Sequence, residues 1–89
     1  MMDNGNLTFT DDSIKLVEVV ADSPISNTQS IKTLIIDKNG KHYISLQKWW
    51  REAKETPWRE GKGFHFEPAE AKGAVEALKK ALDALTRMD

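Results

Sequence analysis

All three tryptophans and most of the positive charge lie in one third of the 89-residue chain. Residues 38–65 hold the three tryptophans, seven lysines and arginines and three acidic side chains, a local charge of +4. Residues 1–37 carry −4 and residues 66–89 carry −1, so the net charge is −1. Aromatic rings can stack on bases, and lysine or arginine can neutralise phosphate. Because phosphate responds to the local field, residues 38–65 are the candidate binding segment.

Trp49 and Trp50 are adjacent, so in a regular strand their side chains face opposite ways. One of them is expected in the core and the other is available to a ligand. If the strand alternates regularly, Trp49 points to the same side as Tyr43 and Gln47, which is the sheet face expected to be left open to a ligand. A twist or bulge at the strand end would expose Trp50 instead.

The residue types needed for catalysis or metal binding do not occur in a recognisable pattern. The chain has no cysteine, and its two histidines, His42 and His65, are far apart in the sequence. Ser45 has no histidine and acid partner by motif, and the Gly61-Lys62-Gly63 segment is too short for a phosphate-binding loop. We therefore expect no enzyme, no catalytic residue, no metal site and no cofactor.

Four short segments have the composition of β-strands: residues 14–20, 31–37, 42–49 and 62–66. Asn39-Gly40 lies between the second and the third, and this pair favours a type I′ hairpin because it tolerates positive φ. Residues 22–30 and 51–61 are predicted as loops. Residues 1–12 are expected to form a flexible N-terminal arm or a frayed first strand, and residues 13–89 a single domain.

A long helix is predicted from Pro68, which suits the first helical position, to about Arg87. The expected fold is α+β, a four-stranded antiparallel sheet followed by this helix (β-β-β-β-α). The helix covers one sheet face and leaves the face with Tyr43, Gln47 and Trp49 open. One side of the helix carries leucines, and a neighbouring stripe of alanines suits close packing against a second helix. Since the chain has neither a second helix nor a disulfide, we expect a homodimer, although alanine also simply favours helix.

The stretch from Gly40 resembles the single-stranded-DNA-binding domain of the positive cofactor four family of transcriptional coactivators. Three pieces carry the resemblance: residues 40–50, ending in Trp49-Trp50, the strand residues 62–66, and Pro68 at the helix start. The resemblance implies a dimeric β-β-β-β-α fold that binds single strands on its concave sheet face. It also implies a role in transcription, replication or repair, in eukaryotes, bacteria or phages.

Carried over by position, Trp50 matches the family's base-stacking tryptophan, Lys41 a turn lysine near phosphate, and Lys62 the lysine that opens the fourth strand. The sequence departs from the family at Gln47 and Gly61, where arginines are frequent, and in lacking an aromatic residue near the turn. These losses should weaken binding. The full set of expected nucleic-acid-binding residues is Trp50, Lys41, Lys62, Lys48, Arg51, Tyr43, Lys54 and Arg59.

The sequence therefore predicts a non-catalytic protein that binds single-stranded DNA or RNA, with transcription or replication proteins as further partners. A dimeric protein-interaction module that uses the open sheet face is the main alternative, and a structural protein of a phage or mobile element is a third. No apolar run is long enough to span a membrane, and residues 1–4 do not open a signal peptide. The expected location is the cytoplasm or the nucleoid, or the nucleus in a eukaryote.

Overall fold

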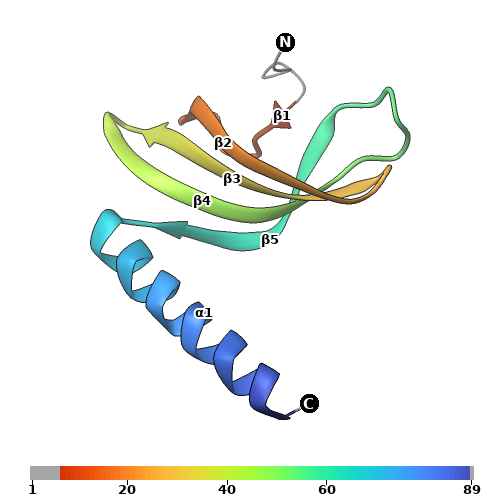
Figure 1. Ribbon diagram of the computed structural model, residues 1–89. Helices are drawn as coiled ribbons and strands as arrows, with labels where there is room; N and C mark the ends of the chain where they lie inside the picture. Colours follow the sequence, from red (N-terminus) through yellow and green to blue (C-terminus); the bar gives the residue numbers. More distant parts are fainter. Residues whose placement is uncertain (1–6, 89) are drawn as a thin grey trace.

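The computed structural model describes residues 7–88, which form five strands and one helix. The elements are β1 (Leu7–Thr8), β2 (Ile14–Ser26), β3 (Gln29–Lys38), β4 (Lys41–Trp50), β5 (Trp58–Phe66) and α1 (Pro68–Met88). The strand order is β1-β5-β4-β3-β2, in which β2 to β5 form an antiparallel meander and β1 is parallel to β5. The sheet is curled, and α1 follows it (Figure 1). The predicted α+β class is confirmed, whereas the sheet has one strand more than the four expected.

All four predicted strands are longer in the structure, and two of them extend well into predicted loops. β2 continues to Ser26 through the segment predicted as a loop, and β5 begins at Trp58 rather than at Lys62. β2 is an edge strand, so Pro24 and several polar residues are tolerated there. It also changes register against β3 at three places, which bends it.

The predicted hairpin turn is present between β3 and β4. Asn39 has φ 54° and Gly40 has φ 83°, the left-handed conformations that a type I′ turn requires. The side chain of Asp37 accepts a hydrogen bond from the Gly40 amide at 3.0 Å. The turn fixes the register of the two strands, so that Ile36 pairs with Tyr43 and Leu34 with Ser45.

The sheet curls around its inner face, which holds the core. Alternate residues of β3 and β4 point to this face, and the buried cluster is Ile14, Leu34, Ile36 and Trp49. Phe9, just after β1, packs edge-on against Trp49 with 5.3 Å between ring centroids and 88° between planes. In the expected N-terminal arm, Leu7 and Thr8 thus pair with β5, and Leu7 and Phe9 help to close the core. Residues 1–6 lie outside the described residues.

The expectation about the open face is wrong. Tyr43, Gln47 and Trp49 point to the inner face, and Trp49 is 0% exposed there. The opposite face, which we call the outer face, is the open one and carries Ile31, Leu46 and Phe64. The reason is that a strongly curled sheet covers its own inner face with its edge strands, so that face needs no helix.

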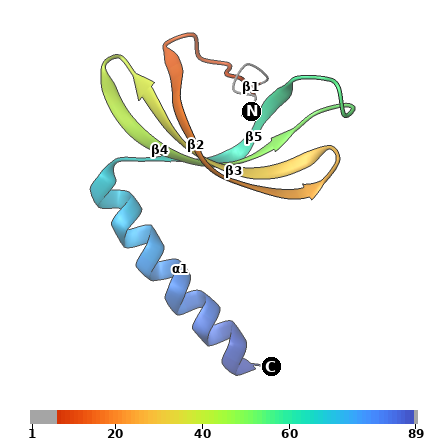
Figure 2. The ribbon, with the colours of Figure 1, turned by 45° about the horizontal axis from the view of Figure 1, so that its top comes forward.

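Helix α1 leaves the end of β5 and extends away from the sheet (Figure 2). Its start is capped, since the Glu70 carboxylate accepts a hydrogen bond from the Glu67 amide at 2.8 Å, ahead of Pro68. Ala71, near this end, is its buried residue. The radius of gyration is 14.5 Å, against roughly 12 Å for a compact chain of this length. The leucine-bearing stripe is therefore exposed: Val75, Leu78, Leu82, Leu85 and Met88.

Candidate nucleic-acid interface

The predicted site residues lie at two ends of the sheet and on both of its faces. Lys41 and Tyr43 lie beside the β3–β4 turn, at the opposite end of β4 from Trp50. A strand rises about 3.3 Å per residue, so roughly 23 Å separates Tyr43 from Trp50 along β4. Lys54 lies exposed in the segment between β4 and β5. The remaining residues cluster near the end of β4: Lys48, Trp50, Arg51, Arg59 and Lys62.

Trp50 ends β4 on the outer face with 39% of its surface exposed. It pairs with Arg59 of β5, which in turn pairs with Thr8 of β1, so the three side chains share one face. The Arg59 guanidinium carbon lies 5.4 Å from the Trp50 ring centroid. A pocket of about 490 Å³ is lined here by Thr8, Thr10, Trp50, Pro57, Arg59 and Glu60. Of the adjacent tryptophans, Trp50 is therefore the one whose ring is accessible to a ligand.

Two lysines continue this surface along the outer face. Lys48 and Lys62 line a second pocket of about 260 Å³, together with the apolar side chains of Ile31, Leu46 and Phe64. Both lysines are exposed, and neither forms an ion pair with another described residue. Their ammonium groups are thus available to an anion. We call Lys48, Trp50, Arg59 and Lys62 the outer-face cluster.

Close contact between β4 and β5 shapes this cluster. The register shifts between Gln47 and Trp49, opposite the segment that contains Gly61 and Gly63. A Cβ on Gly61 would lie 2.5 Å from the Lys48 carbonyl oxygen, and one on Gly63 would lie 2.4 Å from the Gln47 Cα. Glycine is therefore required at both positions, and the arginine expected at Gly61 by family resemblance would not fit this backbone.

Glu60 brings a negative charge to the inner wall of the Trp50 pocket. Partial burial alone would raise the pKa of its carboxyl group, yet hydrogen bonds from Thr10 and Gln47 outweigh burial and lower it. The Thr10 amide donates at 2.8 Å and the Gln47 amide at 3.0 Å. The carboxylate therefore stays ionised at neutral pH, so a phosphate would lie on the Arg59 side of the pocket.

Arg51 and Trp58 make internal contacts. The Arg51 guanidinium carbon lies 4.1 Å from the Trp58 ring centroid, and its Nε donates to the Asn27 carbonyl at 2.7 Å. The Lys32 ammonium lies 4.5 Å from the same ring and 2.9 Å from Asp22. These contacts tie the start of the β4–β5 connection to the β2–β3 turn. Sequence reasoning did not find the role of Lys32, which is only 5% exposed, because its partners Asp22 and Trp58 come from two distant strands, β2 and β5.

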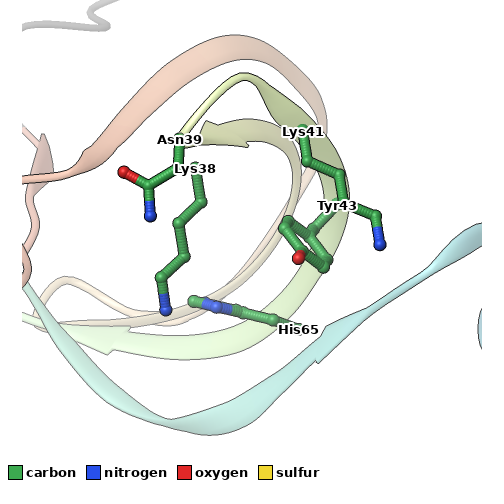
Figure 3. A pocket seen from close by; sticks show the side chains of 5 residues that line it. All are labelled: Lys38, Asn39, Lys41, Tyr43 and His65. Carbon is green, nitrogen blue, oxygen red and sulfur yellow. The ribbon is translucent and has the colours of Figure 1, made fainter.

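A third pocket, of about 340 Å³, lies beside the β3–β4 turn (Figure 3). Lys41 and Tyr43, both predicted site residues, line it with three residues that were not predicted: Lys38, Asn39 and His65. Lys38 and Lys41 flank the turn as a register pair. His65 arrives from β5 because it pairs with Ser45. The alternation of residues 62–66 against 42–49 was the only sequence signal that could have placed His65 here.

Comparison with protein-family models, with curated proteins and with solved structures found no match. Within residues 7–88, no helix combines the length and apolar character needed to cross a membrane. The same part of the chain contains no group of three side chains able to hold a metal ion. The fold and the arrangement of side chains are therefore the basis for a functional proposal.

Proposed function

We propose that this protein binds single-stranded nucleic acid, without catalysing a reaction, through the outer-face cluster. The observation that carries the proposal is the Trp50 ring, exposed at the end of β4 above a 490 Å³ pocket and flanked by Arg59. A base can stack on an open indole face whatever its sequence, and Arg59, Lys48 and Lys62 can neutralise the neighbouring phosphates.

Single strands fit this surface better than duplexes. Stacking on Trp50 requires an unstacked base, which a single strand provides without the cost of unpairing. Reading a duplex in its major groove needs a helix or β-ribbon that projects into the groove. The outer-face cluster lies on the surface of a curled sheet, and α1 turns a predominantly apolar stripe to solvent instead.

We further propose a relationship to the positive cofactor four coactivators, and with it a role in transcription, replication or repair at the nucleoid or in the nucleus. The antiparallel meander of β2 to β5 followed by one helix supports this relationship. Two features depart from the expectation. β1 adds a fifth strand, and the inner face is filled by core side chains, so the ligand surface is assigned to the outer face.

The protein is proposed to act as a homodimer. Val75, Leu78, Leu82 and Leu85 are each more than half exposed on α1, and Phe64 on the outer face is 66% exposed. Fully burying one such side chain contributes about 1.5–3 kcal/mol, and an isolated helix is marginal in water. A second copy offers a matching apolar stripe on its own α1. A C2 arrangement would pack the two helices against each other and leave Lys48, Trp50, Arg59 and Lys62 of the outer face open.

The alternative is a protein-interaction module in which the same apolar surface binds a different protein. Phe64, Leu46 and Ile31 on the outer face favour this alternative, because contiguous apolar patches mark contact sites. Salt dependence separates the two functions. Binding to nucleic acid weakens steeply with salt through counterion release, whereas burial of an apolar surface does not.

Fluorescence anisotropy of a labelled oligothymidylate, compared with a duplex of the same length at two salt concentrations, tests the proposal. We expect preference for the single strand and a negative slope of log K against log salt. Lys62→Ala should flatten that slope by about 0.7, the value for one single-strand phosphate contact. Lys72→Ala, which removes an exposed lysine from α1, is the matched control and should leave the slope unchanged. Equal affinity for both forms, or no binding at low salt, would exclude the function.

A further inference from the structure

The pocket beside the β3–β4 turn is separate from the outer-face cluster. Tyr43 and His65, which line it, point to the inner face, opposite to the face of Trp50. Its volume of about 340 Å³ is at the lower end of the range for ligand pockets. In Figure 3 the Lys38 ammonium, the His65 ring and the Tyr43 hydroxyl converge on one space.

The pocket is lined by hydrogen-bond donors and contains no carboxylate. Lys38 supplies an ammonium group, Tyr43 a hydroxyl, Asn39 an amide and His65 an imidazole, while Lys41 lines the pocket with its ammonium directed past Tyr43 toward Glu67 (Figure 3). These groups come from β3, the turn, β4 and β5, so the sheet register holds them together. Such a set suits a small, highly charged oxyanion.

The two lysines are not fully engaged by their present partners. Lys38 lies 3.6 Å from Asp11, and Lys41 lies 3.5 Å from Glu67, and both pairs are solvent-exposed. These distances exceed the 2.7–3.2 Å typical of a hydrogen bond. Exposed ion pairs of this kind contribute little to the stability of the fold. An anion in the pocket can therefore replace the carboxylates as the partner of these lysines with little loss of stability.

The inner end of the pocket is closed. The next inner-face residues along β3 and β4 are Ile36 and Ser45, and both are fully buried. A polymer cannot continue along the inner face past this point. The pocket therefore admits a group at the end of a molecule and excludes the middle of a chain.

From these features we propose that the pocket formed by Lys38, Asn39, Lys41, Tyr43 and His65 binds a phosphate monoester. A monoester carries more negative charge than the diester of a strand interior and is by nature a terminal group. It is supplied either by the phosphorylated end of a single strand or by a free mononucleotide. The first source rests on the proposed function, and the second does not.

The two histidines allow a direct test on the full chain. His65 lies in the pocket, whereas His42 lies on the outer face near Asp37, at 3.6 Å, and serves as an internal control. Their imidazole NMR signals are followed during titration with inorganic phosphate, thymidine 5′-monophosphate, and oligothymidylates with a 5′-phosphate, a 3′-phosphate or neither. We expect every phosphate monoester, and the phosphorylated strands, to shift the His65 signal and leave His42 in place.

A terminal phosphate should also raise the affinity of a short oligothymidylate by roughly twofold to fivefold, as expected for contact with one partly exposed cation, Lys38. Lys38→Ala should abolish that gain, and Lys15→Ala, an exposed lysine of β2, should retain it. Stronger binding of the phosphorylated strand than of the mononucleotide identifies a strand end as the ligand, and the reverse order identifies the free nucleotide.

The outcomes separate this proposal from the proposed function. If strands bind in a Trp50-dependent manner but a terminal phosphate changes neither affinity nor the His65 signal, the pocket proposal is wrong and the function stands. If phosphate and mononucleotide shift His65 while no strand binds, the pocket proposal stands and the function is wrong. A His65 shift of equal size with the unphosphorylated strand would also overturn the pocket proposal.

Discussion

Trp49 and Trp50 share a residue type and a strand, and their surroundings give them different roles. Trp49 is fully buried against Phe9, whereas Trp50 is exposed beside Arg59. Trp50→Ala should lower single-strand affinity by about 1–3 kcal/mol with little change in melting temperature. Trp49→Ala should lower stability by about 3–5 kcal/mol, because it leaves a large cavity in the core. Thermal melting and anisotropy on both variants test the contrast, and a folded Trp50→Ala protein that binds as the parent does would reject the site.

Asp22 links stability to pH. Partial burial would raise the pKa of its carboxyl group, but hydrogen bonds from Ser30 and Lys32 outweigh burial and lower it below the ordinary 3.8. A lowered pKa in the folded state stabilises the fold above the ordinary pKa, and this stabilisation is lost as the pH falls through the folded value. Asp22→Asn should therefore destabilise the protein at pH 7, by about 1 kcal/mol because half-exposed charges are screened.

Urea unfolding at neutral and acidic pH measures this effect of Asp22. The difference between Asp22→Asn and the parent protein should shrink toward pH 3 and below, where the parent carboxyl group is increasingly protonated. Asp12→Asn, at an exposed position, is the control and should change stability little at either pH. A difference that stays constant with pH would contradict a role for the Asp22 charge.

At the scale of elements, the sequence predicts those features that depend on neighbouring residues. Pro68 and the following periodicity predict α1, and Asn39-Gly40 predicts the hairpin, because both signals act within a few residues. β1 has two residues and exists only because it pairs with β5, whose partner residues are 51 positions away. The end of β2 reads as a loop by composition, and its pairing with β3 overrides that local preference.

The candidate site, like the fold, could be predicted only where the signal lies in neighbouring residues. The cationic, aromatic character of residues 38–65 can be seen in the sequence, and so can the prominence of Trp50 and Lys62. The sheet face that binds the ligand cannot be predicted, because the alternation of side chains does not say which side of a curled sheet holds the core. Arg51 illustrates a second limit: its contacts with Trp58 and Asn27 join segments that only the fold brings together.

Gly63 and Gly73 allow a matched test of the contact between β4 and β5. A Cβ on Gly63 would lie 2.4 Å from both the Gln47 Cα and the Leu46 carbonyl oxygen, whereas one on Gly73 of α1 would meet nothing within 4 Å. Gly63→Ala should destabilise the sheet by about 2–4 kcal/mol through backbone displacement. Gly73→Ala should stabilise the helix by about 0.5–1 kcal/mol. Thermal unfolding measures both, and a neutral Gly63→Ala would show that the strands can separate there without cost.

At the scale of the whole molecule, the chain by itself leaves much apolar surface in water. α1 projects from the sheet (Figures 1 and 2), and the residues of its leucine-bearing stripe are more than half exposed. On the sheet, Phe64 stacks on Phe66 with 5.6 Å between ring centroids and remains exposed. In the proposed dimer the α1 stripes of two copies would pack against each other, and that burial would stabilise a long helix with few contacts of its own.

Leu82 and Lys80 provide the test of that dimer. Both are exposed on α1, but Leu82 belongs to the apolar stripe and Lys80 lies on the opposite, polar side of the helix. Leu82→Glu would place an unpaired charge in the proposed interface, so the equilibrium should shift strongly toward a monomer. Lys80→Glu introduces the same side chain outside the interface and should leave the dimer intact. Sedimentation equilibrium at micromolar concentration measures the mass of both variants and of the parent. A parent protein that sediments at 10.1 kDa would contradict the dimer directly.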